Sequence, residues 1–338
     1  MNLKNPRAIR TAALESLATQ PNHHKVPLVY AGIFSLLSLA VVVVNHIISL
    51  KIDNMTGLAN MGSRAIFSTI SSVLSMVPTI FIIGWEMGYL TCVLRYARRR
   101  YVEPLDLKNG FSRFWPILRA KILMGLVYVG LAIGCMYLSV FIFMSLPISN
   151  AFYELMIPLM DSVTVMSTAI TIDEATLAAA SAAMWPAFVI FGVVFLVASL
   201  PVFYGFRMVH FCICDNGHRG ALAAMKASRT MMKGHKRELF KLDLSFWWFF
   251  LLEGLVSVLC YLDFLLPMAG ITLPLPEAVS YYGFYVLSLA GQVLLYWAFL
   301  NRVTVSRAIF YDAIRPQESA SQGVALGNIF ELAKDYEE

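Results

Sequence analysis

Six long apolar runs constrain the fold of this 338-residue chain more than any other feature. They cover residues 26–50, 66–94, 122–146, 185–211, 244–266 and 280–304. Each exceeds the roughly 20 residues that a helix needs to cross the hydrocarbon core of a bilayer. Hydrophobic residues make up 59% of the chain and charged residues 14%, whereas soluble domains have roughly 45–50% and about 25%. The sequence therefore predicts an all-α, polytopic membrane protein with six transmembrane helices arranged as three hairpins.

The basic residues are sorted to one side of this predicted topology. Of the 26 lysines and arginines, 24 lie before the first run, between runs 2 and 3, between runs 4 and 5 with the adjoining helix ends, or at the end of the last run and beyond it. Only Lys51 and Arg64 lie on the opposite side, and the connection 147–184 contains no basic residue. Because cytoplasmic loops carry the excess of Lys and Arg, we expect both termini to be cytoplasmic. The expected parts are an N-terminal tail (1–25), a membrane domain (26–315) and a mobile C-terminal tail (316–338).

The stretch HKRELFKLDLSFWWFF, residues 235–250, passes directly from charge to aromatic residues. This is typical of a membrane boundary, where basic groups meet anionic headgroups and tryptophans occupy the interface. The basic residues expected to contact headgroups are Lys226, Arg229, Lys233, Lys236, Arg237 and Lys241. The net charge of +5 is therefore explained by the cytoplasmic placement of the basic residues. The sequence shows no basic soluble domain that would bind nucleic acid.

A short amphipathic helix is expected just before this boundary. Lys226, Arg229, Lys233 and Lys236 recur at helical spacing, opposite Leu222, Met225 and Met232, and Gly234 can supply the C-cap. Such a helix either lies in the membrane interface or packs on the protein itself. The pattern does not separate these two alternatives.

Ionisable residues inside apolar spans are the strongest functional candidates in a membrane protein. Glu86 and Glu253 are expected at similar depth in the second and fifth runs, each beside a glycine that permits close helix approach. Further polar candidates in the spans are Asn45, His46, Arg207 and Gln292. One hypothesis is a proton- or cation-coupled site, since two nearby carboxylates raise at least one pKa. The alternative is that each carboxyl group is protonated, or bonded to Arg207 or to the backbone, and only holds helices together.

A weaker candidate is a metal site in HFCICDNGH. His210, Cys212, Cys214, Asp215 and His218 are ligand types for a soft metal, but their spacing matches no standard zinc pattern. Ordinary interfacial cysteines are the favoured interpretation, and no cofactor is expected. No phosphate-binding loop, zinc-protease motif or nucleophile elbow occurs in the chain.

The block AMKASRTMMKGHKRELFKLDLSFWWF resembles the signature of an uncharacterised bacterial membrane family, catalogued as domain of unknown function 975. The matching positions are Ala224, Ser228, Met232, Gly234, Lys236, Leu239, Phe240, Leu242, Leu244, Ser245, Phe246 and Trp248. The closing RAIFYDAI, residues 307–314, is also similar to the family, while the long Ala- and Met-rich connection departs from it. The resemblance implies a multi-span protein of the bacterial cytoplasmic membrane and supplies no activity.

These features favour a transport-related membrane protein, either a permease-like body or a helper of a transporter. The alternative is a non-transporting membrane-organising or assembly factor that binds anionic lipid or a partner protein. An enzyme acting on lipid ranks third. The expected partners are membrane lipid and a second membrane protein or a second copy of the chain, without nucleic acid.

Overall fold

The computed structural model describes residues 5–53, 61–147, 149–150, 153–154, 174–215, 220–268 and 276–315. These residues are helical almost throughout and contain no strand. Their main elements are α1 (Pro6–Ala18), α2 (Lys25–Asp53), α3 (Met61–Ala97), the 3₁₀ helix η2 (Pro104–Arg113), α4 (Phe114–Met144), α6 (Glu174–Phe206), α7 (Val209–Asp215), α8 (Ala221–Met231), α9 (Lys236–Leu244), α10 (Trp247–Leu259), α11 (Leu262–Met268), α12 (Glu277–Leu295), the π-helical segment η3 (Tyr296–Leu300) and α13 (Asn301–Ile314).

Within these described ranges, five continuous helical stretches are long and apolar enough to cross a membrane, and a sixth is obtained if the bent pair α9–α10 counts as one span. They coincide with the six apolar runs of the sequence. The helices also expose large apolar side chains such as Leu36, Val73 and Leu255, each more than half accessible. Such a surface is compatible with lipid contact. The all-α prediction is therefore confirmed, with five to six helices that are long and apolar enough to span a membrane.

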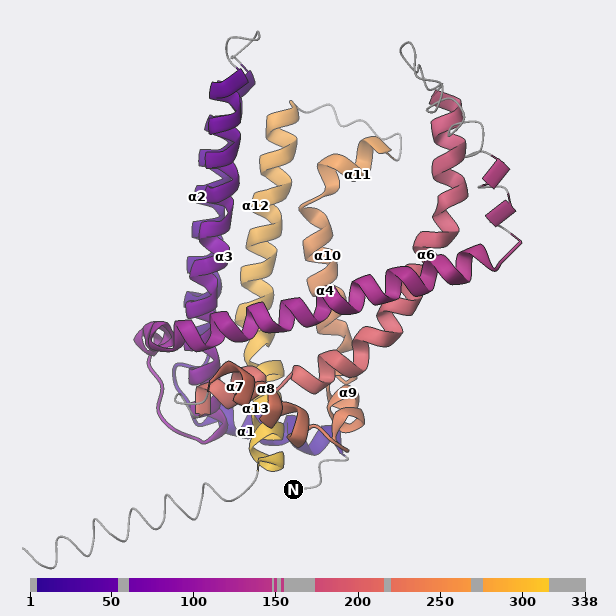
Figure 1. The fold of residues 1–338 in the computed structure, drawn as a ribbon. Coiled ribbons are helices and arrows are strands. Elements are labelled where there is room, and N and C mark those ends of the chain that lie inside the picture. Colours follow the sequence, from indigo (N-terminus) through magenta and orange to yellow (C-terminus); the bar gives the residue numbers. More distant parts are fainter. Residues whose placement is uncertain are drawn as a thin grey trace, which may run out of the picture. The chain divides into compact units, whose positions relative to one another are not determined.

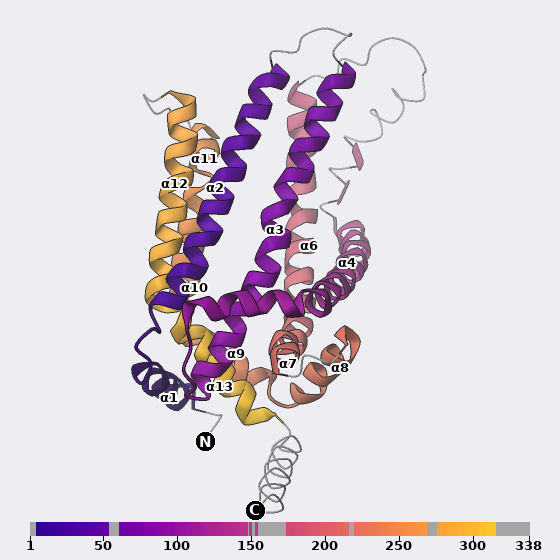
Figure 2. The same cartoon turned by 90° about the vertical axis from the view of Figure 1, so that its left-hand side faces the viewer.

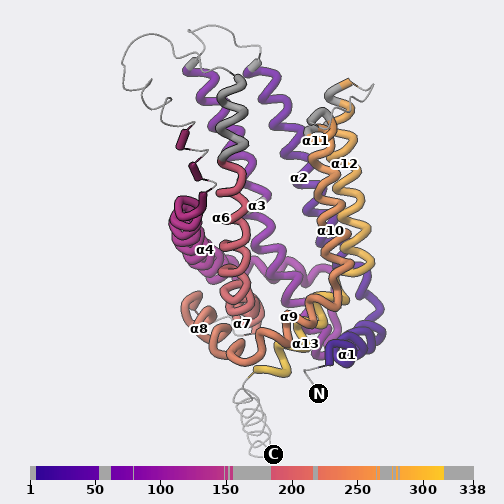
Figure 3. Tube along the Cα trace, turned by 90° about the vertical axis from the view of Figure 1, so that its right-hand side faces the viewer, coloured from indigo at the N-terminus to yellow at the C-terminus, as the bar shows by residue number. Residues whose placement is uncertain are grey.

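The chain divides into two compact units, one comprising Met1–Ala120 and Met208–Glu338 and the other Lys121–Arg207. In the first unit, α2 packs against α3 and α12, and α12 packs against α10. Figure 2 shows α2 and α3 running together, and Figure 3 shows the α10–α12 pair. The short helices α1, α7, α8, α9 and α13 gather at one end of these long helices (Figure 1).

The second unit consists of most of α4 together with α6. In the connection 147–184, Thr171 and Glu174 match a capping box, which predicts a helix that starts there and kinks at Pro186. The described part of helix α6 begins at Glu174 and continues through both Pro186 and Pro201 to Phe206. Thr171, the expected capping residue, lies outside the described residues, as do the C-terminal tail and most of the connection 147–184. The three-hairpin arrangement stays a prediction.

Residues 6–18, expected to belong to a tail, form helix α1. Asn5 caps it by accepting a hydrogen bond from the Arg7 amide at 3.1 Å, and Pro6 occupies the first helical position. Ile9, Ala13 and Leu17 are buried, because α1 packs against α13 and α3. The N-terminal segment is thus an integral part of the first unit.

Ion pairs join the helix ends that carry the basic residues. Arg98, just after α3, binds both oxygens of Asp312 at 3.1 and 2.7 Å and also reaches Asp215 at 2.7 Å. Arg315 donates to the same Asp215. The Asp312 hydrogen bonds raise the pKa of Arg98, so Arg98 remains positively charged. The ends of α3, α7 and α13 are therefore held together by charge as well as by packing.

The boundary between charge and aromatic residues is a break between two helices. Helix α9 ends at Leu244, α10 begins at Trp247, and the two are bent by 64°. The sequence predicts no loop between the charged and the aromatic parts of this stretch. In the structure, two residues, Ser245 and Phe246, separate α9 from α10. They allow the charged helix to turn away from the direction of the apolar one.

Three glycines allow α3 and η2 to approach at backbone distance. A Cβ placed on Gly88 would lie 1.7 Å from the Leu107 carbonyl oxygen, and one on Gly110 would lie 2.1 Å from the Gly84 oxygen. The expected role of the glycines beside Glu86 in close approach is confirmed. Gly254, beside Glu253, faces open space within 4 Å, so the same reasoning does not hold there.

Candidate functional site

A polar contact within the apolar helices joins α10 to the π-helical segment. Tyr296 donates its hydroxyl hydrogen bond to the Glu253 carboxylate at 2.9 Å, and Gln292 donates to the Tyr296 oxygen at 3.3 Å. Glu253, Gln292 and Tyr296 are all half-buried. Two of the sequence candidates, Glu253 and Gln292, are thus connected through a tyrosine.

The second carboxylate, Glu86 of α3, acts on the same tyrosine from another helix. Tyr296 interacts electrostatically with both Glu253 and Glu86. Tyr30 of α2 interacts with Glu86 and with Tyr296. The two phenols therefore lie near the two carboxylates, and with Gln292 five elements, α2, α3, α10, α12 and η3, contribute to one polar cluster. We call Tyr30, Glu86, Glu253, Gln292 and Tyr296 the carboxylate–tyrosine cluster.

This cluster continues toward the end of the unit where the basic residues gather. The Tyr30 ring stacks on Tyr89, with centroids 4.8 Å apart. The Tyr89 hydroxyl donates to Asn301 at 2.7 Å and lies 2.8 Å from the Thr304 hydroxyl. Asn301 in turn donates to the His23 carbonyl. Ring stacking thus connects the cluster to Tyr89, and hydrogen bonds continue from the Tyr89 hydroxyl through Asn301 to the turn before α2.

Such an arrangement is suited to moving protons. A phenol both donates and accepts a hydrogen bond, and a carboxyl group binds and releases a proton. Carboxyl groups inside a membrane protein that face hydroxyl partners are typical of proton paths. The π-helical turn at Tyr296–Leu300 fits this interpretation, because such turns occur frequently at functional sites.

The remaining polar candidates lie elsewhere. Asn45 is fifteen residues from Tyr30 along α2, roughly 22 Å at 1.5 Å per residue. It accepts from Ser71 at 2.8 Å and donates to Ser75 at 3.0 Å, so it joins α2 to α3. His46 packs edge-on against Tyr282 of α12, with ring centroids 5.0 Å apart.

Arg207 belongs to the other unit. Its guanidinium lies 4.8 Å from the centre of the Phe203 ring. The hypothesis that Arg207 neutralises a glutamate stays a prediction.

The cysteine-rich segment is largely buried on α7. The Cys214 thiol lies 3.7 Å from the Thr91 hydroxyl, and Arg113 donates to the Cys214 carbonyl. Asp215 is engaged by Arg98 and Arg315. Over the described ranges, no three or more His, Cys, Asp or Glu residues gather as metal ligands, and His218 falls outside those ranges.

The residues of the predicted basic stripe lie on α8, in the turn after it and on α9, so the single amphipathic helix expected there is two short helices. Lys226, Arg229, Lys233, Arg237 and Lys241 are exposed, and Lys236 is half-buried. The opposite face is mostly covered by protein, since Met225 and Met232 are buried. Leu222 is 70% exposed. The apolar face therefore packs mainly on the protein, which was one of the two alternatives.

The sequence profile of one family, described as Protein of unknown function (DUF975), matches residues 30–318. The chain belongs to the DUF975 family. No curated protein and no solved structure matches it.

The family-like segments of this DUF975 chain form packing and charge contacts. Ala224, Ser228, Met232, Leu239 and Leu242 are fully buried. Gly234 adopts φ +86° in the turn between α8 and α9, two residues after the observed C-cap residue Met232. Gly234 therefore serves the turn to α9 and not the expected helix cap.

Sequence reasoning missed the tyrosines. Aromatic residues were assigned to lipid contact, so Tyr30, Tyr89 and Tyr296 received no role. A signal was present, because Tyr296 follows Gln292 by four residues and shares its helix face. The pairing of Tyr296 with Glu253 depends on the packing of α10 against α12, which sequence periodicity does not specify.

Proposed function

We propose that this protein is a transport-related membrane protein in which the carboxylate–tyrosine cluster carries or couples protons. The observation that carries the proposal is the Tyr296 hydroxyl, which is hydrogen-bonded to Glu253 and lies in the electrostatic field of Glu86. Protonation of one carboxyl group changes the energy of the shared phenol and thereby of the other group. The placement in a bacterial cytoplasmic membrane with cytoplasmic termini is part of this proposal.

The test is proton flux in proteoliposomes that contain a pH-sensitive dye. Glu253→Gln and Tyr296→Phe keep the size of each side chain and remove the titrating group or the hydroxyl. We expect each to reduce proton flux at least about tenfold, as expected for loss of a proton-transferring group. Ser257→Ala is the matched control, because Ser257 lies one turn further along α10 and its hydroxyl donates to the Glu253 backbone carbonyl, at 2.8 Å, and not to the carboxylate.

Two outcomes would contradict the proposal. One is a wild-type protein that gives no flux above protein-free liposomes. The other is a flux that Glu253→Gln, Tyr296→Phe and Glu86→Gln leave unchanged. Size-exclusion chromatography and thermal unfolding of each variant separate a lost proton path from a lost fold.

A second candidate function is that of a membrane-organising factor, favoured by the exposed basic stripe on α8 and α9. In that case the protein would bind anionic vesicles or a partner without flux. Replacing Lys226, Arg229 and Lys233 by Gln would then abolish activity in cells, while Glu253→Gln would have no effect.

A further inference from the structure

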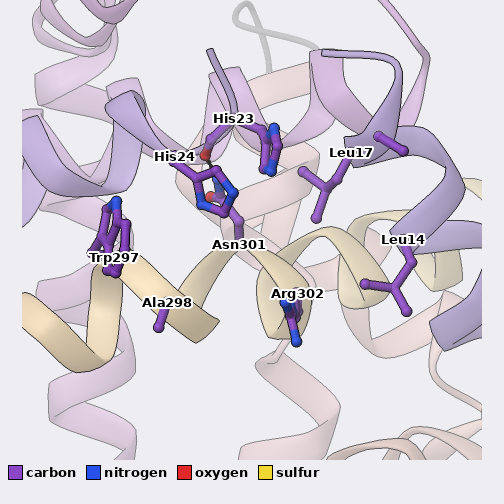
Figure 4. Close-up of a pocket in the computed structure, with 9 residues that line it drawn as sticks. Leu14, Leu17, His23, His24, Trp297, Ala298, Asn301 and Arg302 are labelled. Carbon is purple, nitrogen blue, oxygen red and sulfur yellow. Dashed lines mark hydrogen bonds between the residues drawn. The ribbon is translucent and has the colours of Figure 1, made fainter. Parts of the chain in front are cut away.

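A cavity of about 350 Å³ lies at the start of α2, where the apolar span begins. Figure 4 shows the side chains that line it, which come from α1, the turn before α2, the π-helical segment and α13. Its lining combines three basic side chains with apolar ones, and the lining residues are Leu14, Leu17, Ala18, His23, His24, Trp297, Ala298, Asn301 and Arg302. The described lining contains no carboxylate, so its charge is positive or neutral and never negative.

The basic groups crowd one another. The His23 and His24 rings have centroids 3.8 Å apart. Burial, followed by the repulsion of His23 and Arg302, lowers the pKa of His24. An anion placed between these groups would relieve that repulsion and accept hydrogen bonds from them.

The other half of the lining is apolar and open to the surroundings. Leu14 is 49% exposed and Trp297 is 44% exposed. The Trp297 ring lies 5.8 Å from the ring of His24, one residue before the apolar helix α2 begins, and tryptophan is favoured in the interface where membrane helices end. A ligand that satisfies both halves has a negatively charged head and an apolar tail.

Hydrogen bonds within the protein hold the polar groups at the base of the cavity in place. Asn301 is buried, accepts a hydrogen bond from the Tyr89 hydroxyl and donates one to the His23 carbonyl. His23 also contacts the Gln20 carbonyl through Nδ1 at 2.7 Å. Preorganised groups of this kind lose little conformational entropy when a ligand binds.

We infer that this cavity binds the phosphate-bearing headgroup of an anionic phospholipid, with Arg302, His23 and His24 facing the phosphate and Leu14 and Trp297 facing the acyl chains. The site differs from the basic stripe on α8 and α9, and it does not depend on the proposed proton path. Free phosphate shares the headgroup chemistry, so the experiment separates the two sources.

The experiment measures thermal unfolding of the full chain in detergent against increasing short-chain phosphatidylglycerol, short-chain phosphatidylcholine or inorganic phosphate. Phosphatidylglycerol is expected to raise the unfolding midpoint at lower concentration than either other probe. Arg302→Gln is expected to weaken the apparent affinity for phosphatidylglycerol roughly tenfold or more, the loss expected for one charge-assisted contact. Arg100→Gln is the matched control, since Arg100 carries an equal charge, is exposed, and belongs neither to the cavity nor to the basic stripe on α8 and α9.

Two further variants keep the test decisive if Arg302→Gln fails to fold. His24→Gln changes an exposed side chain, and Ala298→Leu narrows the cavity without changing charge. Both are expected to weaken phosphatidylglycerol binding. Equal effects of Arg302→Gln and Arg100→Gln would overturn the site, and equal effects of inorganic phosphate and phosphatidylglycerol would overturn the lipid as its ligand.

Discussion

Arg307 of α13 donates through Nε to the Asp243 carboxylate of α9 at 2.8 Å. The two side chains are only 11% and 8% exposed. The pair connects the two segments that resemble the family, residues 224–248 and 307–314. The family signature therefore marks a fixed junction between α9 and α13.

Asp243→Asn is predicted to destabilise the protein strongly, because it leaves the Arg307 charge buried without its partner. Breaking a buried pair costs about 3–5 kcal/mol. Thermal unfolding in detergent measures the effect. Glu15→Gln, which breaks a surface pair with Arg99 that is 63% exposed on both sides, should cost at most about 1 kcal/mol. Equal losses for the two variants would refute the interpretation of the buried pair.

Arg98→Lys is predicted to loosen the junction of α3, α7 and α13. A lysine has no planar fork to bind both Asp312 oxygens, and it must also replace the bond to Asp215. We expect a lower unfolding midpoint and faster proteolysis near residues 98 and 315. Arg100→Lys supplies the control, because Arg100 is exposed. A midpoint that Arg98→Lys leaves unchanged would show that packing alone holds the junction.

Gly88→Ala is predicted to separate α3 from η2, because the added Cβ would overlap the Leu107 carbonyl oxygen. Overpacking of this kind costs typically about 1–3 kcal/mol. Gly32→Ala tests the specificity of the effect, since nothing lies within 4 Å of a Cβ on Gly32. Chemical unfolding of both variants gives the comparison. If the Gly88→Ala and Gly32→Ala variants are equally stable, the close approach of α3 and η2 does not contribute to stability.

The sorting of basic residues predicts the orientation of the chain in cells. In a background without reactive cysteines, Arg64→Cys should react with a membrane-impermeant maleimide in intact cells. Lys233→Cys should react only after permeabilisation. Labelling of Lys233→Cys from outside would reverse the proposed topology.

The sequence predicted the helical class and the positions of the long helices, because apolar length and the absence of charge determine both. It also predicted that glycine beside Glu86 permits close packing. It did not predict helix α1, whose apolar residues are too few to stand out from a polar segment. Nor did it predict the Tyr296–Glu253 contact or the cavity at His23 and His24, because these join residues 43 and 278 positions apart. Such pairs depend on which helices become neighbours, and periodicity contains no information on that choice.

The π-helical turn at Tyr296–Leu300 determines the directions in which two polar sites face along one continuous helix. An additional residue per turn rotates everything that follows by about 100° relative to a regular α-helix. Tyr296 thereby meets Glu253 while Asn301, five residues later, meets Tyr89 and the backbone of His23. Regular α-helical winding of the same residues would turn α13 away from these partners by about 100°, so the wide turn at Tyr296–Leu300 is what allows both contacts to form along one helix.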